Sequence, residues 1–355
     1  MKKIYIHIGM PKTGTSSIQN ALTKNNQLFL KNGLFYPLIG TNYSTGYVNG
    51  LYFKNDYKKN FVYNNLLLLK RTSILRKALD QFAKNDCHTL LFSEENLFEH
   101  YNDFCTAFKK FRFFKKFDVK IIIYYRRSVE YIAEIWAQTV KSNRQVYYQK
   151  DGSMVLVDLD CHKQKNISEV SLVDFLANYA HKDNFNTFQR LSETFGKENI
   201  ILRPFEKEQW KNNDLLDDFF SIFGIELNDE FNLQNVNITP NRIQIEKINY
   251  MNSFLPARSF DGFIKTKELM LDSKENQSIV ESLPDSIIKK SSEDYHKEEC
   301  RIAKEFLERD EMFNSKYPSF YGKRRNTYAE LIFDNEEKEE LQKTVQLIKN
   351  KYRNQ

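Results

Sequence analysis

Residues suited to binding a phosphate group are concentrated near the start of the chain, where the sequence from residue 9 reads GMPKTGTSS. Gly9 and Gly14 have the spacing of a phosphate-binding loop, but Thr15 stands where a nucleoside triphosphatase has its lysine. Lys12 brings the cationic side chain into the loop instead. Backbone N–H groups at a helix start can hold a phosphate without a metal. They would be assisted here by the hydroxyls of Thr13, Thr15, Ser16 and Ser17.

A second cationic position follows the apolar run from Val119 to Tyr125, which leads into Arg126 and Arg127. The planar guanidinium group makes two charge-assisted hydrogen bonds to phosphate oxygens, so Arg126 is a candidate phosphate ligand. The structural alternative is a surface arginine pair at the start of a helix.

A pair of carboxylates, Glu94 and Glu95, follows a third apolar run at Thr89 to Phe92. A carboxylate beside a phosphate loop can accept a proton as a general base. The structural alternative is an acidic pair that stabilises the N-terminus of a helix.

The elements that must position these residues are predicted to form an α/β fold, in which a P-loop-type parallel sheet is flanked by helices. Short apolar runs alternate with longer helical patterns, which is typical of such a sheet. The predicted strands are Lys3–Ile8, Thr89–Phe92, Val119–Tyr125 and Ile200–Arg203. Open parallel sheets bind ligands at the carboxyl ends of their strands, where the residues described above lie.

Helices are predicted to start near Thr15, Ser128 and Asn186, and another is predicted over Leu66–Phe82 with Asn64 and Asn65 as its lead-in. Charged helical patterns at Glu293–Arg309 and Asn335–Lys349 dominate the last part of the chain. We therefore expect a core over residues 1–260 and a helical C-terminal extension over residues 261–355, packed on the same domain.

The overall composition favours a globular protein of 355 residues with 41% apolar residues and a net charge of +6. This mild charge predicts no nucleic-acid binding. No apolar stretch approaches the length of a signal peptide or a membrane span, so a cytoplasmic protein is expected. The four cysteines form no closely spaced pair, which favours reduced thiols. The segment Asp158–His162 contains metal-ligand residue types but is interpreted as a loop, and no metal site is expected.

The sequence PKTGTSS after a strand resembles the 5′-phosphosulfate loop of sulfotransferases that use 3′-phosphoadenosine 5′-phosphosulfate (PAPS). Other segments resemble bacterial carbohydrate-type sulfotransferases: Asn32–Pro37, Phe195–Ile200, Leu202–Glu206, Asn235–Pro240 and, less clearly, Ile302–Leu307.

This resemblance implies roles for individual residues. Glu95 would be the general base, with Glu94 in reserve, and Lys12 would stabilise the leaving group. Arg126 and Ser128 would bind the 3′-phosphate, and Phe205 would stack on adenine unless it is a core residue. The family carries a serine eight residues after its arginine, but this chain has Glu134 there, and a carboxylate repels phosphate.

The expected reaction is transfer of a sulfuryl group from PAPS to a hydroxyl of a carbohydrate or glycolipid acceptor. A glycolipid acceptor would bring peripheral contact with a membrane. The aromatic-rich segment Tyr43–Tyr63 is a candidate acceptor groove, with a core segment or a lid as equal alternatives. One alternative is a P-loop kinase, which is disfavoured because the usual lysine is missing and no Mg²⁺-binding aspartate is evident. The other is a non-catalytic nucleotide-binding scaffold, which Glu134 supports.

Overall fold

The computed structural model describes residues 2–38, 61–110, 112–151, 153–156, 163–179, 183–233, 242–255, 285–315 and 333–353. The chain divides into two compact units. The first contains residues 1–127, 183–238 and 298–314, and the second contains residues 128–182, 239–297 and 315–355. Within the described residues, no helix is both long and apolar enough to cross a membrane.

The first unit is built on a five-stranded sheet in which every pair of neighbouring strands is parallel. Its order is β2-β3-β1-β4-β8. The bounds are β1 Lys3–Ile8, β2 Leu34–Phe35, β3 Thr89–Glu94, β4 Asp118–Tyr125 and β8 Ile200–Pro204. The middle strands are buried on both faces, as expected for apolar strands covered by helices. The chain adds strands first on one side of β1 and then on the other, so the strand order reverses at β1.

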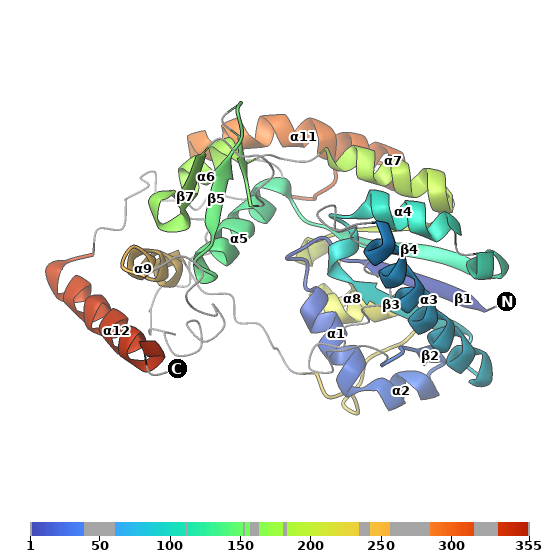
Figure 1. Ribbon diagram of the computed structural model, residues 1–355. Coiled ribbons are helices and arrows are strands. Elements are labelled where there is room, and N and C mark those ends of the chain that lie inside the picture. Colours follow the sequence, from blue (N-terminus) through green and yellow to red (C-terminus); the bar gives the residue numbers. More distant parts are fainter. Residues whose placement is uncertain are drawn as a thin grey trace. The chain divides into compact units, whose positions relative to one another are not determined.

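Helices cover both faces of this sheet (Figure 1). In the first unit they are α1 Thr15–Lys24, α2 Asn26–Lys31, α3 Phe61–Lys84, α4 Tyr101–Lys110, α7 Asn184–Phe195 and α8 Leu215–Ser221, together with the last turns of α11 Asp285–Leu307. Stacked phenylalanines join α2 to α8 and α4 to α7: the Phe29–Phe220 centroids lie 4.4 Å apart and the Phe104–Phe195 centroids 5.5 Å apart. Aromatic residues thus supply much of the packing between neighbouring helices.

One titratable side chain lies at the centre of the sheet. His7 on β1 is fully buried and its Nδ1 lies 2.9 Å from the Ser93 Oγ on β3. Burial lowers the pKa of His7 to about 3, so the ring is neutral at ordinary pH. His7 therefore belongs to the core of the sheet.

The second unit combines helices with a small antiparallel sheet of order β6-β5-β7. Its strands are β5 Gln145–Tyr148, β6 Met154–Val155 and β7 Lys163–Asn166, and its helices are α5 Ser128–Lys141, α6 Leu172–Asn178, α9 Arg242–Asn252 and α12 Asn335–Arg353, with the first turns of α11. The Trp136 indole of α5 donates to the Val170 carbonyl at 3.2 Å. The Asn252 amide of α9 donates to the Val140 carbonyl at 2.7 Å. Both bonds satisfy buried polar groups at the contacts of α5.

Short 3-10 turns connect several of these elements. They are η2 Glu95–Leu97, η3 Arg112–Lys116, η4 Ile167–Glu169, η5 Lys197–Asn199, η6 Lys207–Gln209 and η7 Lys211–Asn213.

The predicted α/β class and the helix-flanked parallel sheet are confirmed. The four predicted strands are present, and the two late helical patterns correspond to α11 and α12. The lead-in predicted at Asn64 and Asn65 is wrong, because α3 begins at Phe61 and both residues lie inside it. The antiparallel sheet was not predicted.

Several predicted features lie outside the described residues. These are the Asp158–His162 loop, the Asn235–Pro240 segment, the boundary between residues 260 and 261, and nearly all of the aromatic segment Tyr43–Tyr63.

Candidate functional site

The predicted site residues of the first unit all follow strands that end at the same edge of the sheet. Gly9 follows β1, Glu95 follows β3, Arg126 follows β4 and Phe205 follows β8. Backbone hydrogen bonds continue the sheet into these loops: Gly9 N–H donates to the Glu94 carbonyl at 3.3 Å, and Phe205 N–H donates to the Tyr125 carbonyl at 2.7 Å. The parallel arrangement therefore brings four distant parts of the sequence to one edge.

The loop from residue 9 to residue 17 wraps around the N-terminus of α1. Gly14 caps the helix in the left-handed conformation, with φ 76°. Lys12 also has a positive φ, 68°, which is unusual for a residue with a side chain and costs conformational energy. The Thr13 hydroxyl donates to the Met10 carbonyl at 2.6 Å and closes the loop internally. The first amides of α1 have no acceptor within the helix, as in any α-helix, and are available to an anion.

Close packing explains why glycine occupies positions 9 and 14. A Cβ on Gly9 would lie 2.4 Å from the Thr15 Oγ1 and 3.1 Å from the Glu95 Cα. A Cβ on Gly14 would lie 2.2 Å from the Leu215 Cδ2 of α8. The loop therefore packs closely against both the Glu95 backbone and helix α8.

The hydroxyls of the loop differ in their surroundings. Thr13 and Thr15 are buried, Ser17 is half-buried and Ser16 is exposed. Among the described residues, the buried Thr15 Oγ1 has no hydrogen-bond partner. An unsatisfied buried hydroxyl costs stability, and a bound oxyanion would remove that cost.

The main chain of Lys12 lies between a carboxylate and a guanidinium group. Its N–H points to the Glu95 Oε1 at 3.4 Å, and its carbonyl accepts a hydrogen bond from the Arg126 Nη1 at 3.0 Å. Lys12, Glu95 and Arg126 come from three different loops, and the structure brings them together. The backbone N–H and carbonyl of Lys12 connect the other two side chains through hydrogen bonds.

Arg126 also contacts an aromatic side chain. Its guanidinium lies 5.4 Å from the centre of the Phe205 ring, within the range of a cation–π interaction. Phe205 is half-buried and meets Trp210 edge to face at 4.9 Å. The Trp210 indole donates to the Pro204 carbonyl at 2.9 Å, which fixes the aromatic pair beside the end of β8.

The two carboxylates have different environments. Glu94 is fully buried at the end of β3. Burial raises the pKa of Tyr36, and the nearby charge of Glu94 raises it further. Glu95 is half-buried beside Lys12. Burial raises the pKa of Glu95 above its usual value, and the positive charge of Lys12 partly opposes this shift. Glu95 is therefore the carboxylate with both access to the loop and a pKa shifted toward that of a general base.

A buried ion pair supports the loops that carry Arg126 and Phe205. Arg127 and Glu206, the next residue in each loop, are almost completely buried and lie 3.6 Å apart. Glu206 accepts a hydrogen bond from the Asn314 N–H at 2.7 Å, and the Arg127 guanidinium lies 4.3 Å from the centre of the Phe313 ring. Sequence analysis did not identify this pair. Its only signal is that each member follows a candidate site residue.

The two remaining predicted positions belong to the second unit. Ser128 is the first residue of α5 and is fully buried, and Glu134 is half-buried on the same helix. The role predicted for Ser128 at the 3′-phosphate therefore stays a prediction.

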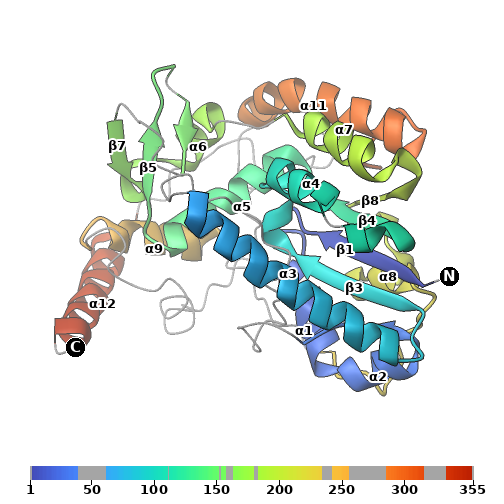
Figure 2. The ribbon, with the colours of Figure 1, turned by 45° about the vertical axis from the view of Figure 1, so that its right-hand side comes forward.

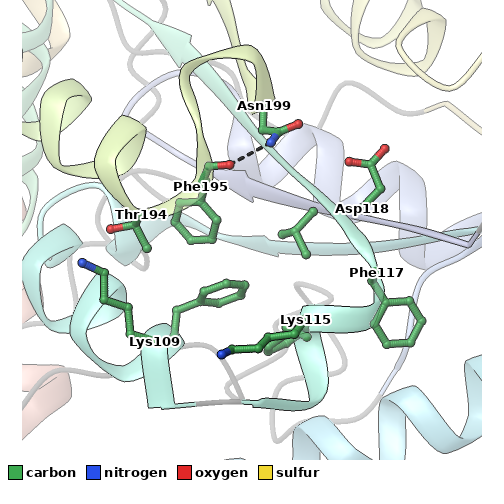
Figure 3. Close-up of a pocket in the computed structure, with 10 residues that line it drawn as sticks. Lys109, Lys115, Phe117, Asp118, Thr194, Phe195 and Asn199 are labelled. Carbon is green, nitrogen blue, oxygen red and sulfur yellow. Dashed lines mark hydrogen bonds between the residues drawn. The ribbon is translucent and has the colours of Figure 1, made fainter.

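A cavity of about 400 Å³ lies at the opposite edge of the sheet, beside Asp118 and Val119 at the start of β4 (Figure 3). Phenylalanines from α4 and α7, including Phe108 and Phe195, form its walls. It contains none of the predicted site residues. The chemistry-bearing side chains are thus gathered at the carboxyl edge, away from this cavity.

The chain matches no protein-family model, no curated protein and no solved structure. Any assignment of function therefore depends on the residues and their geometry.

Proposed function

We propose that the protein is a PAPS-dependent sulfotransferase that transfers a sulfuryl group to a hydroxyl of a carbohydrate or glycolipid acceptor. The observation that carries this proposal is the position of Lys12, whose backbone meets Glu95 on one side and Arg126 on the other, next to the free end of α1. This brings an anion-binding helix end, two cations and a candidate base to one edge of the sheet.

The loop would bind the 5′-phosphosulfate as a P-loop-type element. The amides of Gly14, Thr15 and Ser16 and the neighbouring hydroxyls suit a doubly charged anion at a helix N-terminus. Arg126 would bind the 3′-phosphate by exchanging its hydrogen bond to the Lys12 carbonyl for charge-assisted bonds to phosphate oxygens. The exposed part of Phe205 would stack on adenine. The role of Ser128 at the 3′-phosphate stays a prediction.

In the reaction, the acceptor oxygen would attack sulfur as the bond from sulfur to the 5′-phosphate oxygen breaks. Glu95 would take the proton of the acceptor hydroxyl, and Lys12 would stabilise the negative charge that develops on the departing phosphate oxygen. The products are a sulfate ester and 3′-phosphoadenosine 5′-phosphate. Glu95 and Lys12 act on opposite ends of the transferred group, which requires both at this edge.

The first test is calorimetric binding of 3′-phosphoadenosine 5′-phosphate, adenosine 5′-phosphate and ATP to the wild type and to Lys12→Ala and Arg126→Ala. We expect the 3′-phosphate to strengthen binding and Arg126→Ala to remove that advantage, a loss of roughly tenfold or more for a charged hydrogen bond. Lys12→Ala should weaken binding of all three ligands.

Arg190→Ala is the matched control, because Arg190 pairs with Glu193 on the surface of α7. It should leave all three affinities unchanged. Equal or tighter binding of ATP would replace the sulfotransferase proposal with a kinase-like one. Binding without transfer to any acceptor from labelled PAPS would favour a non-catalytic scaffold.

A further inference from the structure

The cavity beside the start of β4 is formed by elements of the first unit alone. Helices α4 and α7 lie side by side there (Figure 2), and the start of β4 and the turns η3 and η5 complete the lining. The volume of about 400 Å³ falls within the range of about 300–1,000 Å³ that is typical of small-molecule pockets. The cavity is therefore large enough to hold a small ligand.

Four phenylalanines give the cavity an aromatic lining. Phe108 stacks on Phe114 with ring centres 4.8 Å apart, and its ring centre lies 4.5 Å from that of Phe195. Phe117 packs against Phe82 of helix α3 at 6.4 Å. Because these rings pack on one another, the lining is already formed without a ligand. An aromatic ligand gains ring contacts here in addition to the burial of its apolar surface.

Two polar side chains of the lining already have partners within the protein. The Thr194 hydroxyl donates to the Arg190 carbonyl at 2.8 Å. The Asn199 amide donates to the Phe195 carbonyl at 2.7 Å, and its oxygen accepts from the Lys120 ammonium at 3.4 Å. These bonds fix the end of α7 and the start of β8. Recognition of a polar group on a ligand therefore depends mainly on the charged side chains of the lining.

The charged side chains of the lining are Lys109, Lys115 and Asp118. Both lysines are exposed, and Asp118 is half-buried. In Figure 3 the two ammonium groups lie toward one side of the cavity and the Asp118 carboxylate lies toward the other. With two cations and one carboxylate, the lining carries a net positive charge, and its cationic side suits an anionic group.

We propose that this cavity binds a small aromatic carboxylate. The aromatic body fills the space between the phenylalanines, and the carboxylate lies beside Lys109 and Lys115. The cavity lies at the amino ends of β4 and β8, whereas Arg126 and Phe205 follow the carboxyl ends of the same strands. The two sites are therefore separate, and this inference is independent of the proposed function.

The test is calorimetric titration of the full chain with cinnamate and with cinnamyl alcohol, its uncharged analogue. We expect cinnamate to bind with one-to-one stoichiometry and more tightly than the alcohol. Lys109→Ala and Lys115→Ala should each weaken cinnamate binding by about two- to fivefold, as expected for an exposed ion pair, and leave binding of the alcohol unchanged. Lys12→Ala should alter neither affinity, because Lys12 lies at the opposite edge of the sheet.

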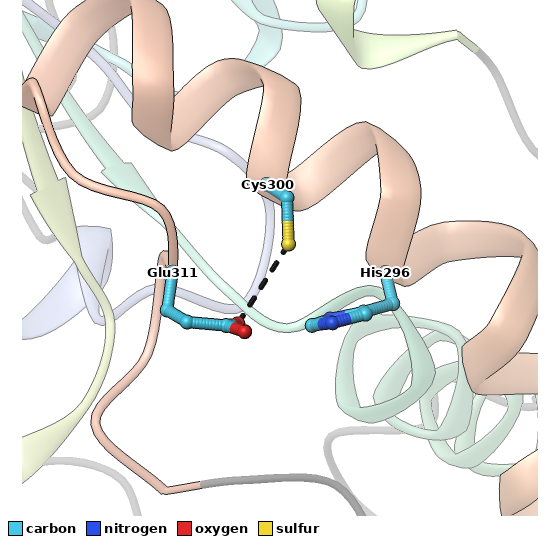
Figure 4. Close-up of side chains that lie close together, drawn as sticks. All are labelled: His296, Cys300 and Glu311. Carbon is cyan, nitrogen blue, oxygen red and sulfur yellow. Dashed lines mark hydrogen bonds between the residues drawn. The ribbon is translucent and has the colours of Figure 1, made fainter.

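Control variants separate the charge of the cavity from the charge of the whole protein. Lys110→Ala removes a neighbouring lysine of α4 that does not line the cavity, and it should leave cinnamate binding unchanged. Asp118→Asn should strengthen cinnamate binding, because it removes the negative charge of the lining. Glu311→Gln should have no effect, because Glu311 lies outside the lining and accepts a hydrogen bond from the Cys300 thiol at 3.7 Å (Figure 4).

Equal affinity for cinnamate and cinnamyl alcohol would overturn the assignment of an anionic ligand. Losses in Lys109→Ala and Lys115→Ala no larger than in Lys110→Ala would overturn it as well. Tighter binding of octanoate, an aliphatic carboxylate of similar size, would overturn the assignment of an aromatic ligand. If the wild type binds none of the three compounds, the site itself is excluded. The three lysines are exposed, so their variants are expected to fold, and urea unfolding checks this.

Discussion

At the scale of single residues, Glu95 occupies an environment that opposes its own charge. Burial raises its pKa, the nearby Glu99 raises it further, and Lys12 lowers it. In the folded protein the ionised form is therefore disfavoured relative to the unfolded chain, and stability falls as the pH rises from the unfolded pKa through the folded pKa. An ionised carboxylate that destabilises the fold is typical of an active site, because the reaction needs its charged form.

Glu95→Gln should lower the rate of sulfuryl transfer by about 100- to 10,000-fold, because the general base is lost. It should leave the affinity for 3′-phosphoadenosine 5′-phosphate intact and slightly raise the free energy of unfolding at neutral pH, since no charge is buried. Single-turnover rates, calorimetry and urea unfolding measure the three quantities. A variant that transfers at the wild-type rate would exclude Glu95 as the base.

The pH dependence of the sulfuryl-transfer rate is a second test of Glu95 as the general base. Removing the negative charge of Glu99 in Glu99→Gln should lower the pKa of Glu95, so the acid limb of the rate profile should move to lower pH.

At the scale of elements, the loop of residues 9–17 requires glycine at position 14 for two separate reasons, the backbone conformation and the close packing. Gly14 has φ 76° and packs against Leu215, whereas Gly224 has φ 71° and nothing within 4 Å of a Cβ. Alanine at either position costs about 1–2 kcal/mol for the left-handed conformation. Only Gly14→Ala adds overpacking, which costs about 1–3 kcal/mol more.

We therefore expect Gly14→Ala to lower the free energy of unfolding more than Gly224→Ala and to weaken binding of 3′-phosphoadenosine 5′-phosphate as well. Urea unfolding and calorimetry on the two variants provide the comparison. Equal losses of stability with unchanged binding would mean that the contact between the loop and α8 is unimportant.

The same elements show what the sequence could predict. Apolar runs identify β1, β3, β4 and β8, and the rule that parallel strands share a carboxyl edge then places Gly9, Glu95, Arg126 and Phe205 together. Strand β7, in contrast, has the sequence KQKN, in which apolar and polar residues do not alternate. Its pairing with β5 therefore depends on the surrounding structure and could not be predicted from its own sequence. The Arg127–Glu206 pair depends on contacts between distant segments, which a local pattern does not encode.

At the scale of the whole molecule, the first unit is assembled from three separate stretches of chain. Its last stretch contributes Glu298, whose carboxylate accepts hydrogen bonds from the N–H groups of Asn184 and Phe185 at 2.6 and 3.2 Å. It also contributes Phe313 and Asn314, which cover the Arg127–Glu206 pair. The core predicted over residues 1–260 therefore lacks part of the support of its own site.

A chain that ends at residue 260 should lose amide hydrogen-exchange protection in α7 and β8, because it lacks these contacts. A chain that ends at residue 315 keeps them and is the matched control, with protection expected to fall only around α9, where Glu337 of α12 pairs with Lys247 at 3.3 Å. Equal protection of β8 in both truncated chains would show that residues 298–314 are dispensable for the first unit.

The interrupted order of the first unit also affects its synthesis. A ribosome adds residue 206 roughly a hundred residues before residue 314, and at about 5–20 residues per second the delay is on the order of ten seconds. During that interval Arg127 and Glu206 have emerged without the segment that covers them. The first unit therefore cannot complete its fold until residues 298–314 have emerged, and until then the polar pair beside its apolar sheet is unshielded.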